Sequence, residues 1–285
     1  DIRDSVVTEV TSRVMNSCLA RSEQTDGMAL DVLINDTLYH EKKRLEAHRS
    51  APNWALDLAF WDTVKGRLAR AGDREQARLL ESIISRFTFE VLGNFSRSVY
   101  EVSTRILPTA LPLLLQGLSP KAILSQGLPD LKDTIRLDGQ IDALKRCQAH
   151  GTVILTPTHV SNLDSVVIGW ALYALGLPPF TYGAGLNLFS NPVLAFFMKN
   201  LGAYRVDRTK KAPLYKEVLK EYATVCLEHG QSQLFFPGGT RSRSGQVESR
   251  LKLGLLSCGL RAYINNLNKA MAGKDLPPVT EAAKE

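Results

Sequence analysis

The chain has 285 residues, of which 44% are hydrophobic and 22% charged, a composition typical of an ordinary soluble globular protein. No apolar run reaches the roughly 18 to 20 residues that span a bilayer, so a transmembrane protein is not expected. The net charge of +6 is uneven, because residues 199–261 alone carry twelve Lys and Arg against five Asp and Glu. Such a basic region suits phosphate groups on a substrate, a lipid headgroup or a nucleic acid.

Apolar residues at helical spacing predict an α-helical N-terminal domain over residues 1–130. Asp26 is expected to cap a helix that runs to Leu45, and a longer helix is predicted from Arg74 to Ser103. The longer helix carries an apolar stripe with a period of 3.6 residues, whose natural partner is another helix. This half has no cluster of catalytic residue types, so scaffolding, regulation or partner docking is expected of it.

Gly, Pro and Ser accumulate between Gly117 and Asp130, and we place the domain boundary there. Residues 131–285 then alternate strands and helices. Strands are predicted at Thr152–Leu155, Phe180–Gly183, Ala203–Val206 and Ser232–Phe236. Helices are predicted at Gln140–His150, Ser165–Leu175, Pro192–Leu201, Leu214–Glu228 and Leu251–Asn266. This alternation predicts an α/β domain with a mainly parallel, mixed sheet covered by helices.

His159 and Asp164 follow the first predicted strand, at the entry to an apolar helix. Reactive groups in α/β folds lie at the carboxyl ends of strands, and a carboxylate beside an imidazole sets its tautomer and raises its basicity. The pair is therefore a candidate general base with its orienting carboxylate. Taken alone, His159 is more often a structural histidine, and Asp164 also fits a helix-capping carboxylate.

Two arginine-bearing stretches also lie just past strand ends. The first is Gly-Ala-Tyr-Arg-Val-Asp-Arg, residues 202–208, which contains Arg205 and Arg208. The second is Phe-Pro-Gly-Gly-Thr-Arg-Ser-Arg-Ser-Gly, residues 236–245, which contains Arg241 and Arg243. Glycines allow a backbone to approach a ligand closely, and guanidinium groups grip phosphate in bidentate fashion. A solvated turn is the alternative for Arg241 and Arg243.

These three stretches together resemble the motifs of the glycerolipid acyltransferase family, whose members acylate glycerol 3-phosphate and 1-acylglycerol 3-phosphate. His159-Val-Ser-Asn-Leu-Asp164 resembles its H-x4-D motif, and residues 202–208 resemble its second motif, with Arg205 in place of the usual aromatic residue. Residues 236–242 resemble its third motif, usually Phe-Pro-Glu-Gly-Thr-Arg-Ser. The resemblance covers about residues 150 to 260.

The resemblance implies acyl transfer from an acyl-CoA or acyl-carrier-protein thioester to a hydroxyl of glycerol 3-phosphate, for phospholipid biosynthesis. His159 would be the general base and Asp164 its orienting group, with no acyl-enzyme, no cofactor and no metal. Arg208, Arg241 and Arg243 would bind phosphate. An acceptor or oxyanion loop would involve Gly238, Gly239, Thr240 and Ser242. Arg205 fits either role, and Ser161 and Asn162 are expected to shape the His–Asp turn.

The chain departs from the family pattern in two places. Gly238 stands where the family carries a Glu, and the fourth motif is missing, because residues after Asn268 run through Leu276-Pro-Pro-Val into a charged tail. The resemblance therefore implies that residues 131–285 lack part of the native C-terminal region. A 1-acylglycerol 3-phosphate acceptor remains an alternative. So does a catalytically impaired family member that binds lipid or acts as a scaffold.

Partners and location follow from the charge and the expected product. A peripheral contact with an anionic membrane surface, in the cytoplasm or on the cytoplasmic face of a membrane, is expected because the product is a lipid. Lys210 and Lys211 are interpreted as solvated residues or as contacts with anionic lipid. The four cysteines show no disulfide or zinc spacing and are expected to be reduced, buried thiols. Nucleic acid is not an expected partner, because it leaves the His–Asp pair unexplained and no aromatic residues are interleaved with the basic ones.

Overall fold

Two compact units make up the chain in a computed structural model that describes residues 2–24, 29–51, 53–116, 135–161, 163–186, 192–239, 241–242 and 251–272. The helical unit comprises Asp1–Leu92, Arg205–His229 and Ser257–Glu285. The sheet unit comprises Gly93–Tyr204 and Gly230–Leu256. Each unit therefore combines segments that are far apart in the sequence.

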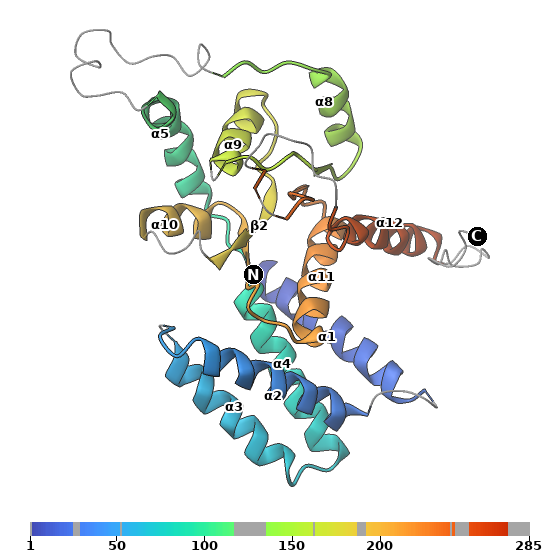
Figure 1. Cartoon of the computed structure of the whole chain (residues 1–285). Coiled ribbons are helices and arrows are strands. Elements are labelled where there is room, and N and C mark those ends of the chain that lie inside the picture. Colours follow the sequence, from blue (N-terminus) through green and yellow to red (C-terminus); the bar gives the residue numbers. More distant parts are fainter. Residues whose placement is uncertain are drawn as a thin grey trace. The chain divides into compact units, whose positions relative to one another are not determined.

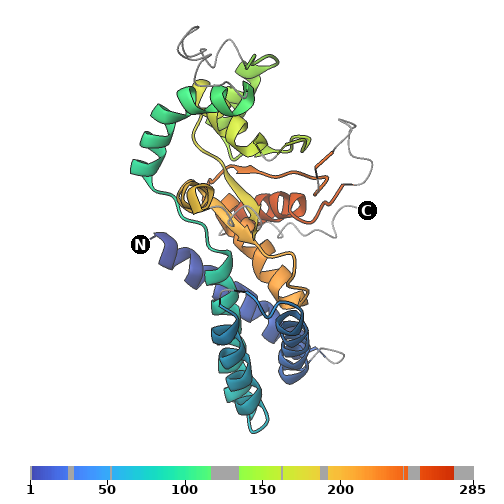
Figure 2. The ribbon, with the colours of Figure 1, turned by 60° about the vertical axis from the view of Figure 1, so that its left-hand side comes forward.

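The helical unit contains helices from both ends of the chain (Figure 1). In Figures 1 and 2 the orange helix α11 lies among the blue and teal helices of the N-terminal half, and α1 packs against both α4 and α11. Helix α2 packs against α3 and α4. The helices are α1 (Ile2–Ser22), α2 (Leu30–Ala47), α3 (Trp54–Leu68), α4 (Asp73–Val91), α11 (Pro213–Glu228) and α12 (Leu256–Met271).

Local sequence signals account for the start of two helices and for their packing. Asp73 and Glu75 lie in the first turn of α4, where a negative charge stabilises the helix end, and Pro213 opens α11. The predicted apolar stripe is fully buried where it falls on α4, at Leu79, Leu80, Ile83, Ile84, Phe87 and Val91. Leu92, directly after α4, is also buried, but the predicted continuation fails at Phe95, which is exposed, and Val99 is only partly buried.

The prediction of one helix from Arg74 to Ser103 was wrong, because α4 ends at Val91 and a separate helix α5 (Arg97–Gln116) follows. Between them the backbone pairs with a distant segment. The carbonyl of Asn94 accepts a hydrogen bond from the N–H of Gly202 at 2.8 Å, and Phe95 forms an antiparallel bridge with Leu201. Long-range pairing of this backbone therefore overrides a helical periodicity that continues through it.

The sheet unit has a four-stranded sheet whose strand order is β1-β4-β2-β3. Strand β4 lies between β1 and β2 and pairs with both in parallel. All four predicted strands are present, although β1 and β4 are shorter than expected. The elements of this unit are α5, α8 (Ile141–His150), β1 (Ile154–Leu155), α9 (Asp164–Ala174), β2 (Thr181–Gly185), α10 (Pro192–Asn200), the first half of β3 (Ala203–Val206), and β4 (Gln233–Leu234).

The core of the sheet unit forms where helix α9 and the following loop meet the sheet. Leu172 of α9, Phe180 and Leu234 of β4 are all buried in one cluster. The α/β fold with a mainly parallel sheet and a helical N-terminal region is confirmed. Because β1 and β4 are parallel neighbours, their carboxyl ends lie at the same edge of the sheet.

Some predictions lie outside the described residues. The domain boundary between Gly117 and Asp130 is one of them, and the tail after Ala272 is another. The C-terminal helix was predicted from Leu251 but begins at Leu256. Among the described residues, no helix combines the length and hydrophobicity that crossing a membrane requires.

All four cysteines lie in described parts of the chain and none forms a disulfide. Cys18, Cys226 and Cys258 are buried, as expected, and burial raises the pKa of each of these thiols. Cys147 is exposed, contrary to the expectation of a buried thiol.

Candidate active site

His159 and Asp164 lie in hydrogen-bond contact just beyond the end of β1. Strand β1 ends at Leu155, and Asp164 is the first residue of α9, so the loop between them carries His159. The distance from Nδ1 of His159 to Oδ2 of Asp164 is 2.7 Å. The two side chains are 22% and 19% exposed, which leaves the pair accessible to a small substrate.

The carboxylate of Asp164 is held by the backbone of the same loop. Its Oδ2 accepts hydrogen bonds from the N–H of Val160 at 2.7 Å and of Ser161 at 2.9 Å. Partial burial raises the pKa of Asp164, but the hydrogen bonds from Ser161, His159 and Val160 outweigh it and hold the pKa below its usual value. Asp164 is therefore ionised at neutral pH, and it favours the tautomer of His159 that carries its proton on Nδ1.

The third motif packs directly against His159. The ring of Phe236 stacks on the imidazole, with ring centroids 4.2 Å apart and planes inclined by 27°. The N–H of Ser242 donates to the carbonyl oxygen of His159 at 2.6 Å. These contacts arise because β1 and β4 end at the same edge of the sheet. Two stretches that are distant in the sequence therefore form one local structure.

Gly239 gives this turn its shape. Its φ is +69°, a conformation that favours glycine, and its N–H donates to the carbonyl of Phe236 at 3.1 Å. A Cβ at this position would lie 2.7 Å from Cδ of Lys252, whose own N–H donates to the carbonyl of Pro237 at 2.7 Å. The backbone conformation of this turn therefore favours glycine at 239, and a Cβ there would also displace the flexible end of the Lys252 side chain.

The other predicted residues of the sheet unit are placed as follows. The hydroxyl of Ser161 accepts a hydrogen bond from the N–H of Leu163 at 3.2 Å, so Ser161 shapes the turn before α9. Arg241 is exposed, next to the anchored Ser242. Gly238 is half-buried in the turn. Asn162, Thr240 and Arg243 lie outside the described residues.

Arg205 and Arg208 belong to the helical unit. Arg205 is half-buried on β3, and Arg208 is exposed on the turn that follows. The interpretation of Lys210 as a solvated or lipid-contacting residue was wrong, because its ammonium group is buried and ion-paired with Glu41 and Glu90. Lys211 is exposed, as expected.

Sequence reasoning missed two residues of the site. Phe236 belongs to the third motif, but the motif does not predict its stacking on His159. The signal for this contact is the position of Phe236 just after a strand that is parallel to β1. Lys252 lies outside the quoted motifs, and no pattern in the sequence singles it out.

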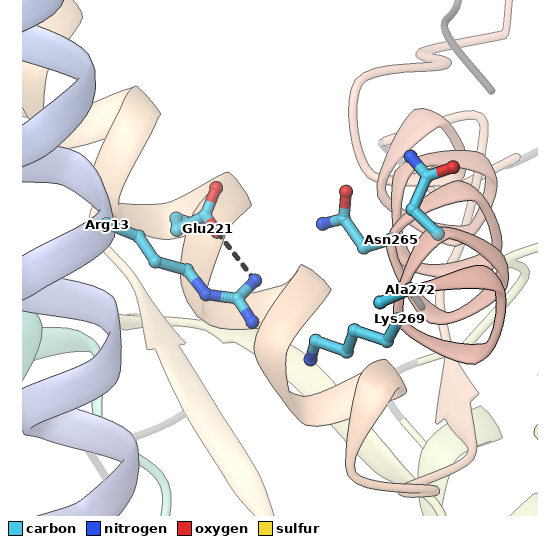
Figure 3. A pocket seen from close by; sticks show the side chains of 6 residues that line it. Arg13, Glu221, Asn265, Lys269 and Ala272 are labelled. Carbon is cyan, nitrogen blue, oxygen red and sulfur yellow. Dashed lines mark hydrogen bonds and ion pairs between the residues drawn. The ribbon is translucent and has the colours of Figure 1, made fainter. Parts of the chain in front are cut away.

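A pocket of about 480 Å³ lies elsewhere, within the helical unit (Figure 3). Figure 3 shows Arg13 of α1 pointing toward Glu221 of α11, and Lys269 reaching across from α12. The charged groups here pair within the protein: Arg13 with Glu221 at 3.2 Å, and Lys269 with Glu228 at 2.7 Å. None of the predicted site residues lines this pocket. In the described parts of the chain, no group of three or more His, Cys, Asp or Glu is arranged to hold a metal ion.

Comparison with known proteins gives a consistent result. Residues 140–269 match the family model described as Acyltransferase, a stretch that draws on both units. A glycerol-3-phosphate acyltransferase of Xanthomonas axonopodis pv. citri is 33% identical over 130 residues, which are 45% of this chain and 14% of that protein. The protein of the same name from Pseudomonas syringae pv. tomato is 35% identical over 115 residues, 40% of this chain and 14% of that protein. One from Pseudomonas fluorescens is 31% identical over 147 residues, 51% of this chain and 17% of that protein. The aligned region therefore spans only about a sixth or less of these curated relatives.

Proposed function

We propose that this chain transfers a fatty acyl group from a thioester donor to a hydroxyl of glycerol 3-phosphate, because residues 140–269 match the Acyltransferase family model and resemble part of several glycerol-3-phosphate acyltransferases. The donor is acyl-CoA or acyl-carrier protein. The observation that carries the proposal is the His159–Asp164 hydrogen bond beside the third-motif turn. The name shared by these relatives, glycerol-3-phosphate acyltransferase, supports glycerol 3-phosphate as the acceptor.

In the proposed reaction His159 acts as general base through Nε2. The Nδ1–H of the ring donates to Asp164, so the basic lone pair of the imidazole is on Nε2. As Nε2 takes the hydroxyl proton, the acceptor oxygen attacks the thioester carbonyl and forms the new C–O bond. The C–S bond then breaks, and the departing thiolate recovers the proton from the imidazolium. The products are an ester and a free thiol, with no acyl-enzyme.

Asp164 supports each stage of this proton transfer. Its lowered pKa keeps it charged, so it stabilises the imidazolium that forms when His159 accepts the proton. Phe236 limits the orientations of the ring by stacking on it. The base is therefore held in one tautomer and one plane before the substrate binds.

The arginines bind the phosphate of the acceptor in this proposal. Arg241 lies next to Ser242, whose N–H donates to the carbonyl of His159. The phosphate-binding roles of Arg208 and Arg243 rest on the family resemblance. Among the described residues of this loop, the N–H of Gly239 donates to Phe236 and that of Ser242 to His159, and we assign the expected oxyanion role to the N–H of Gly238. The chemistry uses no metal or cofactor, and peripheral contact with an anionic membrane delivers the lipid product.

Gly238 favours a second candidate function. The family resemblance places a glutamate there, and glycine has no side chain with which to hold an acceptor. A family member with impaired catalysis that binds lipid is the alternative. Within the enzyme class, 1-acylglycerol 3-phosphate is the alternative acceptor.

Labelled acyl-CoA and acyl-carrier protein, each offered with glycerol 3-phosphate or 1-acylglycerol 3-phosphate, test these functions directly. His159→Ala is expected to lower kcat by about 10²- to 10⁴-fold, because it removes the general base, while acceptor binding is retained. The matched control is His150→Ala, an exposed histidine at the end of α8, which should leave kcat unchanged. Near-normal turnover by His159→Ala would refute the general-base role.

Gly238→Glu separates the enzyme from the impaired family member. Faster transfer by this variant would show that the missing carboxylate limits the reaction. If neither wild type nor Gly238→Glu transfers acyl groups to either acceptor, while both bind lipid vesicles, the enzyme function is wrong.

A further inference from the structure

The turn that carries Arg208 is fixed at both ends by polar contacts within the helical unit. The N–H of Asp207 donates to the hydroxyl of Tyr215 on α11 at 2.9 Å. The Oδ1 of Asp207 accepts hydrogen bonds from the N–H and the hydroxyl of Thr209 at 2.8 and 2.6 Å. The N–H of Lys210 donates a hydrogen bond to the carbonyl of Asp207 at 3.3 Å, which completes the turn. Arg208 and Thr209 are thereby exposed at the tip of a tightly tied turn.

Lys210, the next residue after this exposed tip, is buried in the helical core. Its side chain is 4% exposed, and its Nζ lies 2.9 Å from Oε2 of Glu41 on α2 and 2.9 Å from Oε2 of Glu90 on α4. The ammonium group also lies over the ring of Phe87, 4.7 Å from its centroid. A buried ammonium is costly unless it is paired, and here both charge and packing partners are supplied by helices.

The pairs formed by Lys210 belong to a closed ring of six alternating charges. Arg44 binds Glu41 and Asp57, each at 2.8 Å, and Arg86 binds Asp57 and also Glu90, the latter at 3.1 Å. The ring therefore runs, in order, through Lys210, Glu41, Arg44, Asp57, Arg86, Glu90 and back to Lys210. Its formal charge is zero, so removing one member leaves an unbalanced charge among its neighbours.

We propose that Lys210 is a positioning residue for Arg208: it fixes the turn to helices α2 and α4, and the fixed turn presents the guanidinium for binding of the acceptor phosphate. The proposal rests on the phosphate role given to Arg208 above. It assigns a task to the helical half of the chain, in which no catalytic residue types cluster. Hydrophobic side chains often fill such a space with equal or greater stability, so an ion pair with defined geometry suits the alignment of a neighbouring group.

Steady-state kinetics of the whole protein test this role. Lys210→Met is expected to raise the KM for glycerol 3-phosphate about tenfold with kcat and the donor KM little changed, because only alignment of the phosphate is lost. Glu228→Gln is the matched control, since it breaks a buried ion-pair cluster in the same unit that does not touch the turn. An acceptor KM raised equally in both variants would overturn the proposal, because the effect would then be general destabilisation.

A double-variant cycle shows whether Lys210 acts through Arg208. Arg208→Ala should itself raise the acceptor KM by about 10- to 100-fold, and Lys210→Met should add nothing in that background. Additive effects would overturn the proposal. An unchanged acceptor KM in Arg208→Ala would also overturn it, while continued acyl transfer by that variant would leave the proposed reaction standing.

Two further measurements cover variants that fold poorly or lack activity. Tyr215→Phe removes the hydroxyl that accepts from Asp207 without changing any charge, and it should raise the acceptor KM about threefold. Amide hydrogen exchange over residues 205–212 should be faster in Lys210→Met than in Glu228→Gln whether or not acyl transfer is seen. Equal exchange in the two variants, or an unchanged acceptor KM in Tyr215→Phe, would overturn the proposal.

Discussion

The turns that carry Arg208 and Arg241 are held in different ways. Side chains hold the Arg208 turn, through the carboxylate of Asp207, the hydroxyl of Tyr215 and the buried ammonium of Lys210. Backbone groups hold the described part of the Arg241 turn, where main-chain N–H groups donate to main-chain carbonyls at both ends. One turn therefore depends on charge, and the other depends on the path of the backbone.

This difference determines which substitutions each turn tolerates. Loss of a charge leaves a buried ion without its partner near Arg208, whereas the backbone bonds near Arg241 persist through most side-chain changes. Conversely, an added Cβ at Gly239 meets both an unfavourable φ and the side chain of Lys252. Substitutions of opposite kinds should thus damage the two turns selectively.

The largest effect is expected from removing a charge beneath the Arg208 turn. Glu41→Gln should lower the free energy of unfolding by about 3–5 kcal/mol, because Glu41 is fully buried and binds both Lys210 and Arg44. Denaturant unfolding followed by circular dichroism measures the change. Glu46→Gln, on the exposed face of the same helix, should alter stability by less than about 0.5 kcal/mol. Equal stability of the two variants would contradict a charge-dependent anchor.

A smaller effect, on catalysis, is expected from adding a Cβ to the Arg241 turn. Gly239→Ala should lower kcat about 100-fold, because it shifts a turn whose Phe236 stacks on the proposed base. Gly176→Ala is the matched control, since Gly176 has a φ of +71° but no atom within 4 Å of a Cβ. It should cost about 1–2 kcal/mol of stability and leave kcat unchanged. A similar loss of kcat in both variants would refute the special role of this turn.

The smallest effect concerns a charge cluster that anchors neither turn. Burial raises the pKa of Glu228, but bonds from Arg13, Lys269 and Asn265 lower it to about 2. Unfolded Glu228 takes up its proton near pH 4.5, so the unfolded chain binds more protons between these values and stability is lost as the pH falls from about 4.5 to about 2.

Glu228→Gln should flatten the pH dependence of the unfolding temperature in this window and remove roughly 2 kcal/mol of stability at neutral pH. Calorimetric scans of wild type and variant from pH 5 to pH 3 measure both quantities. Parallel pH profiles for the two proteins would show that the depressed pKa of Glu228 does not govern acid stability.

Local patterns in the sequence were enough to predict most elements of the fold. The apolar stripe of α4 repeats every 3.6 residues, and β1 to β4 arise from short apolar runs. Both patterns reflect which side chains of a single segment are buried, so they can be seen in the local sequence. The same locality applies to His159 and Asp164, which are five residues apart and meet within one loop. Motifs that follow parallel strands were expected at one sheet edge, and Phe236 does meet His159 there.

Only the tertiary structure decided the features that join distant segments. The helix break after Val91 depends on pairing between Asn94 and Gly202, which no local periodicity reports. Lys210 has the sequence context of a surface lysine, and it is buried because Glu41 and Glu90 arrive from distant helices. The neighbouring sequence does not show whether a charged side chain is buried. Its burial is stable only when oppositely charged partners from other segments lie beside it. The sequence by itself therefore determined most of the elements and the proposed base, and the packing of helices decided which contacts hold the Arg208 turn.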